Sequence, residues 1–165
     1  MTANNISGET RLNTLDVGCG NAYNADIRVD KFRGSANVIA SADMLPFIDN
    51  VFDNTICISV LEHVPHWQEA LTEICRVTKK NITVEVPVNS NTLKTDIFRV
   101  ILPIPENIKL LLKMKERAKN NLWQFNPKVL ARVIGLHRFS ASHREIVQYY
   151  HGMPSRCWRV SGVKP

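Results

Sequence analysis

An acidic residue followed by two closely spaced glycines gives the first sign of chemistry in this chain. Asp16 lies near the end of an apolar run, and Gly18-Cys19-Gly20 follows it. Glycines let the backbone turn tightly and approach a ligand without side-chain obstruction. One such pair is a weak signal by itself, so its meaning depends on what the following strands carry.

Each of the next three apolar runs also has a polar residue at its end or directly after it. Asp30 ends the second run, where a carboxylate can accept hydrogen bonds from both hydroxyls of a ribose. Asp43 and Met44 follow the third, where a carboxylate can meet the exocyclic amine of an adenine. Ser59 and Val60 lie at the end of the fourth. Open α/β sheets bind ligands at the carboxyl ends of their strands, so these positions predict one shared site.

The elements that position these residues follow from the apolar pattern. Apolar runs over 12–17, 27–30, 38–42 and 55–60 alternate with polar loops, as in an α/β sheet. The run 55–60 is almost continuous, which is typical of a strand buried on both faces of a parallel sheet. It is therefore expected to be the central strand.

An amphipathic helix is predicted after this fourth strand. Its apolar positions recur at spacings of three and four residues, at Trp67, Ala70, Leu71, Ile74 and Cys75. Asn81 is expected to follow as a left-handed cap before a strand over 82–86.

Residues 88–126 differ in character, because they combine polar, apolar and basic stretches. A basic amphipathic helix is predicted over 106–120. Such a helix can cover an active site or lie on a membrane, and it can also be an ordinary packed helix with a solvated basic face.

The last part of the chain predicts one helix and a strand pair. Asn126 and Pro127 are expected to begin a helix over 128–135 that ends at Gly135. Two further strands are predicted, over 144–150 and over 157–163. With the turn at 152–155 between them they form an antiparallel hairpin.

The first two crossovers are unusually short. Nine residues separate Gly20 from Asp30, and a parallel crossover that includes a helix normally takes at least about 10–12 residues. The fold class predicted is therefore α/β, Rossmann-like and mainly parallel, with an antiparallel C-terminal hairpin and with the first crossover helices shortened or missing. We expect a single domain over 1–165. It comprises a cofactor-binding core at 12–87, a basic cover at 88–126, and a C-terminal helix with its strand pair at 127–165.

The charge is distributed unevenly between the two halves. Residues 1–85 carry seven basic and eleven acidic side chains, a net charge of −4, whereas residues 86–165 carry fourteen and four, a net charge of +10. Such a basic half attracts a phosphate-bearing substrate, nucleic acid or an anionic membrane surface. A solvated basic face without a partner explains the same composition.

The four cysteines contain no CxxC pair, and three of them lie inside apolar runs. We interpret them as reduced thiols of the core in a cytoplasmic protein. A chain of 165 residues can bury a core without disulfides, which makes a disulfide framework the weaker alternative.

A family resemblance rests on these motifs taken together. The segments LDVGCG, SADMLPF, NVFDNTICISVLEHVP and EALTEICRV, with the acid at Asp30, resemble the class I S-adenosylmethionine-dependent methyltransferases, most closely their small type 11 branch. The resemblance implies S-adenosylmethionine as cofactor and S-adenosylhomocysteine as product. It also implies that the methyl group moves by in-line displacement.

The resemblance assigns cofactor binding to four groups of residues. The loop around the methionine part contains Asp16, Gly18, Cys19 and Gly20, and the ribose ligand is Asp30. The adenine edge is formed by Asp43 and Met44, and the residues near the transferred methyl group are Ser59 and Val60.

Glu62 and His63 follow these residues. His63 is the candidate general base for a hydroxyl acceptor, because an imidazole can take a proton near neutral pH. The alternative is that both side chains only cap the following helix and fix the loop. Relatives in ubiquinone biosynthesis resemble this segment but have an acid three residues before the Glu-His pair that helps hold a metal. Ser59 stands there in this chain, so no metal is predicted.

The leading hypothesis is methyl transfer to a small, anionic acceptor bound beneath residues 88–126. A non-catalytic module that binds S-adenosylmethionine is the second, motivated by the short crossovers. A third is a surface that binds nucleic acid or an anionic membrane through basic side chains of the cover, at Lys109, Lys113, Arg117 and Lys119. The short loops fit an open pocket, a degenerate one, or one completed by a partner subunit such as a second copy in a homodimer.

Overall fold

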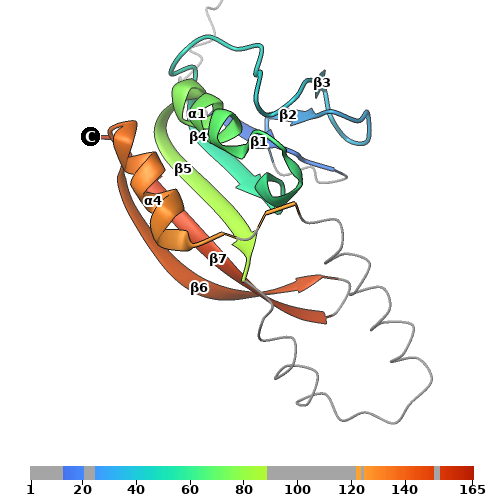
Figure 1. The fold of residues 1–165 in the computed structure, drawn as a ribbon. Helices are drawn as coiled ribbons and strands as arrows, with labels where there is room; N and C mark the ends of the chain where they lie inside the picture. Colours follow the sequence, from blue (N-terminus) through green and yellow to red (C-terminus); the bar gives the residue numbers. More distant parts are fainter. Residues whose placement is uncertain (1–12, 21–24, 89–121, 124, 151–152) are drawn as a thin grey trace, which may run out of the picture.

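The computed structural model describes residues 13–20, 25–88, 122–123, 125–150 and 153–165, and shows a sheet with helices packed on it (Figure 1). In chain order the elements are β1 (Thr14–Val17), β2 (Ile27–Asp30), β3 (Val38–Ile39), β4 (Phe52–Ile58), the short 3-10 helix η1 (Leu61–His63), α1 (Trp67–Val77), β5 (Thr78–Pro87), α4 (Pro127–Leu136), β6 (Ser140–Tyr150) and β7 (Met153–Val163).

One sheet contains all seven strands, in the order β3-β2-β1-β4-β5-β7-β6. Strands β1 to β5 pair in parallel, whereas β7 is antiparallel to β5 and to β6. This arrangement confirms the predicted Rossmann-like fold with an antiparallel C-terminal hairpin. Strand β4 lies at the centre, as expected.

The crossover between β2 and β3 contains no helix, as predicted. Side chains hold the short connection: Arg28 donates from Nε to the Ser35 carbonyl at 2.8 Å, and its backbone N–H donates to Asn37 Oδ1 at 2.7 Å. Between β1 and β2, the described residues form only turns and bends.

Helices α1 and α4 both lie on one face of the sheet (Figure 1). The strand side chains on that face are apolar, as in the row of Cys57, Val84 and Val160 on neighbouring strands. They form the core together with the helix residues Leu71, Ile74, Leu130 and Ile134.

The opposite face of the sheet is polar, and no described helix covers it. Its cross-strand rows contain short polar side chains, such as Asn54 and Asn81, whose amides hydrogen-bond at 2.8 Å, and Thr83 beside Ser161. The prediction that the central strand is buried on both faces is therefore wrong, because Ile58 on this face is 36% exposed.

Two helix ends differ from the sequence prediction. Helix α1 passes directly into β5, where the extended Thr78 caps it by donating its hydroxyl to the Ile74 carbonyl, and Asn81 lies inside the strand. Helix α4 begins at Asn126, whose side chain accepts from the backbone of Lys128, as predicted. It ends at Leu136 rather than Gly135, and the left-handed residue beyond it is Arg138.

The C-terminal hairpin is longer than predicted, because Tyr150 pairs with Met153 and the predicted turn at 153–155 is part of β7. The predicted strand over 38–42 is likewise shorter, since β3 contains only two residues. The predicted helix over 106–120 lies outside the described residues.

All four cysteines are buried and free, which confirms their interpretation as core thiols. No helix in the described part of the chain is long and apolar enough to span a membrane.

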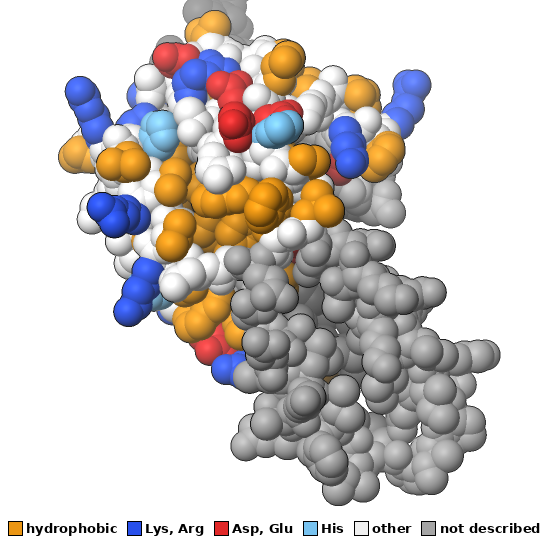
Figure 2. Space-filling model, viewed as in Figure 1, with side chains coloured by type: hydrophobic (Ala, Val, Ile, Leu, Met, Phe, Trp, Pro, Cys, Tyr) orange, Lys and Arg blue, Asp and Glu red, His pale blue; other side chains and the backbone are white. Residues whose placement is uncertain are grey.

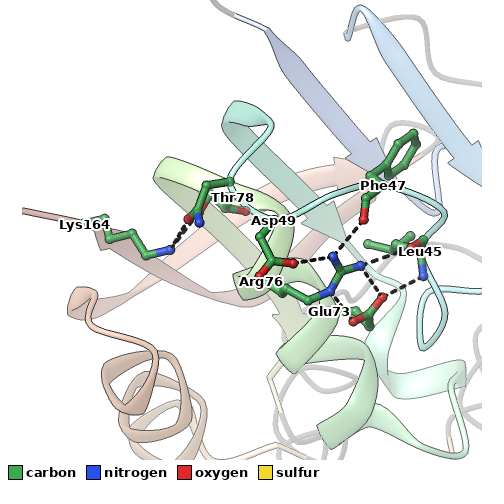
Figure 3. A network of polar contacts seen from close by, with 8 residues as sticks. Leu45, Phe47, Asp49, Glu73, Arg76, Thr78 and Lys164 are labelled. Atoms are coloured by element: carbon green, nitrogen blue, oxygen red, sulfur yellow. Dashed lines mark hydrogen bonds and ion pairs between the residues drawn. The ribbon is translucent and has the colours of Figure 1, made fainter.

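Arg76 of α1 fixes the loop that leads from β3 to β4 (Figure 3). Its guanidinium donates to the carbonyls of Leu45 and Phe47 and to the carboxylates of Glu73 and Asp49, at 2.6 to 3.1 Å. Glu73 in turn accepts from the backbone N–H of Leu45 at 2.9 Å. One side chain therefore supports a loop that adjoins the candidate site.

Replacing Arg76 with methionine is expected to lower the free energy of unfolding by about 2–4 kcal/mol. The change leaves Glu73 and two loop carbonyls without their charged donor, and hydrogen bonds to charged groups contribute about 1.5–3 kcal/mol each. Urea unfolding measures the effect. The exposed Arg132 of α4 provides the matched control. Equal losses in Arg76→Met and Arg132→Met would contradict a structural role of this network.

Candidate functional site

The glycine loop after β1 packs closely on the loop after β4. Gly18 has φ +76° and Gly20 has φ +53°, in the region that favours glycine. A Cβ atom on Gly18 would lie only 2.2 Å from Val60 Cγ2. The backbone N–H groups of Gly18 and Cys19 both donate to the Val29 carbonyl, at 2.7 and 3.2 Å. The loop is thus fixed between β2 and the residues beyond β4.

Asp30 secures the same loop from the end of β2. Its Oδ2 accepts from the N–H of Gly20 at 2.9 Å, and its Oδ1 accepts from the N–H of Phe32 at 2.9 Å. Each carboxylate oxygen has a second lone pair that can accept from a ligand hydroxyl. Asp30 therefore holds the glycine loop, a role that was not predicted, and its role as ribose ligand stays a prediction.

Asp16 lies on the polar face of β1, beside Arg28 and Ile56 of the neighbouring strands. It is only 5% exposed. Burial raises the pKa of Asp16, Arg28 lowers it and Asp30 raises it, and together they move it from 3.8 to about 6. The carboxylate is therefore poorly compensated and favours a cationic group in its surroundings.

Asp43 and Met44 lie beyond β3 at the same edge of the sheet. Asp43 is half-buried and lines an open depression of about 410 Å³ together with Gln68, Glu69, Thr72 and Glu73. Among the predicted cofactor residues only Asp43 lines this depression, beside residues of α1. Met44 is exposed.

Ser59 and Val60 form the sharp turn after β4. Ser59 has φ +56°, and its N–H donates to the Glu85 carbonyl at 2.9 Å. Val60 contacts Gly18, as described above. The structure thus brings the ends of β1, β2 and β4 together, with Asp43 and Met44 further along the edge.

Glu62 is a buried acid in the short helix η1. It is 3% exposed, and its Oε2 makes no hydrogen bond within the described part of the chain. Burial raises the pKa of Glu62, while a backbone hydrogen bond and His63 lower it. His63 is exposed, and its Nε2 lies 3.9 Å from Glu62 Oε1.

A C-terminal segment covers this turn. The backbone N–H of Leu122 donates to the Glu62 carbonyl at 2.7 Å, and Trp123 Nε1 donates to the Val64 carbonyl at 2.8 Å. Phe125 then packs edge-to-face on Trp67, with 5.2 Å between the ring centroids. The exposed imidazole of His63 therefore lies on a turn that is held at a fixed place beside the glycine loop.

The sequence analysis missed Glu85, a buried acid of β5 that is 1% exposed. Glu85 Oε1 accepts from Arg159 Nε at 2.5 Å, and Oε2 accepts from the side chain of Gln148. The alternation of Thr83 and Glu85 with Val84 and Val86 was a usable signal, because period-two patterning indicates a strand with one polar face.

The arrangement has the features of a ligand-binding site. A glycine cradle, a carboxylate able to bind ribose and a poorly compensated acid converge where β1, β2 and β4 end. Within the described residues, no group of three histidine, cysteine or acidic side chains is placed to hold a metal.

This mostly parallel sheet with its antiparallel hairpin is a Rossmann-like fold, and the candidate site lies at the carboxyl ends of its strands. Residues 25–84 match the family model of a methyltransferase domain. This match covers 60 of the 165 residues, so it shows that the central part of the chain is similar to a methyltransferase domain. The matched segment includes Asp30 and Ser59 but begins after the glycine loop.

A curated relative is an uncharacterized protein of Methanocaldococcus jannaschii. It is 37% identical over 101 residues, which cover 51% of this chain and 44% of that protein. The chain thus spans less than half the length of this relative.

Solved methyltransferases share the fold at low sequence identity. A possible histamine N-methyltransferase of Thermotoga maritima has a TM-score of 0.62 at 14% identity, over 92% of this chain and 82% of that chain. A putative methyltransferase of Haloferax volcanii, in complex with the activator Trm112, has a TM-score of 0.63 at 12% identity, with the same coverage. The magnesium protoporphyrin IX methyltransferase of Synechocystis with bound SAH has a TM-score of 0.56 at 13% identity, over 93% and 74%.

Proposed function

We propose that the chain binds S-adenosylmethionine and transfers its methyl group to a small, anionic acceptor, with S-adenosylhomocysteine as product. The observation that carries this proposal is the contact of Gly18 with Val60, together with the hydrogen bond from Gly20 to Asp30. These contacts join the ends of three parallel strands into one cradle, where this family binds its cofactor. The net charge of +10 in the second half favours an anionic acceptor.

The residues at the cradle fit this cofactor. The backbone of the glycine loop borders space for its methionine part at Gly20, where a Cβ atom would meet no heavy atom within 4 Å. Asp30 retains lone pairs for the ribose hydroxyls. The buried charge of Asp16 favours a ligand with positive groups. We assign the adenine edge to Asp43 and Met44, and no metal to the site.

The cofactor supplies an electrophilic methyl group on a sulfonium. The acceptor lone pair forms the new bond to carbon while the C–S electron pair remains on sulfur, so the chain needs only to hold the two reactants in line. Ser59 and Val60 border the place where this occurs. For a hydroxyl acceptor, His63 takes the released proton, and its exposed position leaves the imidazole accessible to an acceptor.

A non-catalytic binding module is the second candidate, favoured by the helix-free crossover between β2 and β3. A less enclosed pocket can bind cofactor without supporting turnover, or it is completed by a partner such as a second copy of the chain. Tight cofactor binding without methyl transfer to any member of a broad acceptor panel would favour this candidate.

The third candidate, a nucleic-acid or membrane surface, has less support in the described part of the chain. Figure 2 shows apolar side chains at the centre of the helix-covered side and basic side chains spread around its edges. The four basic residues proposed for phosphate contacts, from Lys109 to Lys119, lie outside the described residues. The buried free thiols favour a cytoplasmic location.

Replacing Asp30 with asparagine is expected to weaken S-adenosylmethionine binding by about tenfold to a hundredfold. The amide keeps the shape of the side chain but replaces one acceptor with a donor, which costs about 1–3 kcal/mol when a ligand hydroxyl loses its partner. Calorimetric titration with S-adenosylmethionine and S-adenosylhomocysteine measures the change.

Asp53→Asn is the matched control, because Asp53 pairs with Lys80 at the opposite end of β4. Its affinity for both ligands is expected to equal that of the wild type. Absence of binding by the wild-type protein itself would refute the cofactor proposal.

A further inference from the structure

Four residues on neighbouring strands, three of them charged, form one row on the polar face of the sheet. Ile58 of β4 pairs with Glu85 of β5, Glu85 with Arg159 of β7, and Arg159 with Arg144 of β6. Directly paired residues point to the same side of a sheet. The row therefore begins at the residue before Ser59 and ends with two adjacent arginines.

The single carboxylate of this row is fully engaged. Glu85 is buried, and its two oxygens accept from Arg159 Nε and from the Gln148 side chain. Arg159 uses only Nε in this contact and is 33% exposed. Its terminal guanidinium nitrogens make no other hydrogen bond to the described residues.

Arg144 adds a second positive charge without a compensating acid. It is exposed and forms no hydrogen bond or ion pair with the described part of the chain. The nearest acid in sequence, Glu145, points to the opposite face and pairs with Arg156. The row therefore has two guanidinium groups for one carboxylate. Like charges directly opposite each other destabilise a strand pair, so this pair of arginines favours an anion between them.

We propose that Arg159 and Arg144 bind the anionic group of the methyl acceptor, a carboxylate or a phosphate. This inference rests on the proposed methyl transfer and specifies its substrate class. Arg159 lies two strands from Ile58, which corresponds to about 10 Å at the usual strand spacing. The acceptor is therefore a small molecule that carries its anionic group apart from the atom that receives the methyl group.

Glu85 acts as a positioning residue in this site. By holding Arg159 through Nε, it fixes the plane of the guanidinium and leaves the terminal nitrogens to meet two oxygens of an anion. Its backbone carbonyl also accepts from the N–H of Ser59 at 2.9 Å. Glu85 thus connects the anion site with the turn beside the proposed methyl group.

Arg144→Gln is the variant that tests this site, because an exposed side chain can be replaced without unfolding the protein. The protein is saturated with S-adenosylhomocysteine and titrated with inorganic phosphate in one arm and acetate in the other. NMR signals of the arginine Nε–H groups report binding. We expect the variant to bind the preferred anion about tenfold more weakly than the wild type, as for the loss of one charged hydrogen bond.

Arg132→Gln on α4 is the matched control, since it removes one exposed positive charge elsewhere. Its affinity is expected to stay within about twofold of the wild type, as for screened surface charges. The double variant Glu85→Gln/Arg159→Gln removes both charges of this ion pair and is expected to abolish binding. A stronger response to phosphate than to acetate, or the reverse, identifies the kind of anionic group.

Unchanged anion affinity in Arg144→Gln would overturn the proposal, and so would an equal loss in Arg132→Gln or no anion binding by the wild type. Calorimetry with S-adenosylmethionine separates the two ideas. Arg144→Gln is expected to bind the cofactor as tightly as the wild type. Failure of cofactor binding in every variant would refute the proposed function, whereas loss of anion binding alone concerns only the acceptor site.

Discussion

Replacing Gly18 with alanine is expected to abolish detectable binding of S-adenosylmethionine and to destabilise the protein by about 3 kcal/mol. Two effects add up. The positive φ disfavours any residue with a Cβ atom by about 1–2 kcal/mol. The new methyl group would also lie 2.2 and 2.8 Å from the two γ-carbons of Val60, so the loop after β4 must shift, at about 1–3 kcal/mol.

Gly20→Ala separates these two effects. Gly20 has a similar φ of +53°, but no heavy atom lies within 4 Å of a Cβ atom built on it. Only the conformational cost of about 1–2 kcal/mol is expected there. Adding Val60→Ala to Gly18→Ala is expected to recover part of the stability. Urea unfolding and calorimetry measure both properties. Equal losses in the two glycine variants would show that the contact with Val60 is unimportant.

Replacing Asp16 with asparagine is expected to stabilise the protein by about 3 kcal/mol at pH 8 while weakening S-adenosylmethionine binding at least about tenfold. Burial raises the pKa of Asp16 from 3.8 to about 6, and each pKa unit corresponds to about 1.4 kcal/mol. The charged form is costly in the free protein. Asparagine removes that cost, and it also removes the negative charge that favours the cationic cofactor.

The pH dependence of this effect has a definite sign. Below about pH 4 the carboxyl is protonated in both folded and unfolded chains, so ionisation costs nothing. Between about pH 4 and 6 the unfolded chain ionises first, and the wild type loses stability. The advantage of Asp16→Asn over the wild type therefore grows through this range and is constant above it. Glu62, whose pKa is also raised, is present in both proteins and cancels in the difference.

Urea unfolding at pH 4 and pH 8 measures this advantage. The exposed Glu69 of α1 supplies the control, and Glu69→Gln is expected to show the same small effect at both pH values. A stability difference for Asp16→Asn that does not change with pH would contradict the assigned cost of burying the charge.

The sequence was sufficient where local chemistry fixes a position. The tight turn at the glycines after the first strand, the strand that ends at Asp30 and the Asn126 cap are local features, and each was placed correctly. The short crossovers were also predictable, because chain length limits what nine residues can form.

Features that depend on packing partners distant in the sequence were not predictable. The apolar run over 55–60 resembles a strand buried on both faces, yet Ile58 is exposed because no described helix covers that side. The pairing of Glu85 with Arg159 joins residues 74 positions apart. The depression that Asp43 shares with α1 likewise joins residues that lie about 25 positions or more apart in the sequence.

The polar face of the sheet limits how this scaffold can be redesigned. A crossover helix transplanted from a longer methyltransferase would place its apolar stripe against this face, whose rows contain the amides of Asn54 and Asn81 and the hydroxyl of Thr83. Such a graft would bury amide and hydroxyl groups away from water, and each group left without a hydrogen bond would lower the free energy of unfolding by about 1–3 kcal/mol. Restoring a three-layered protein therefore requires new residues in the strands as well as new helices, so strand surface and helix content must be redesigned together.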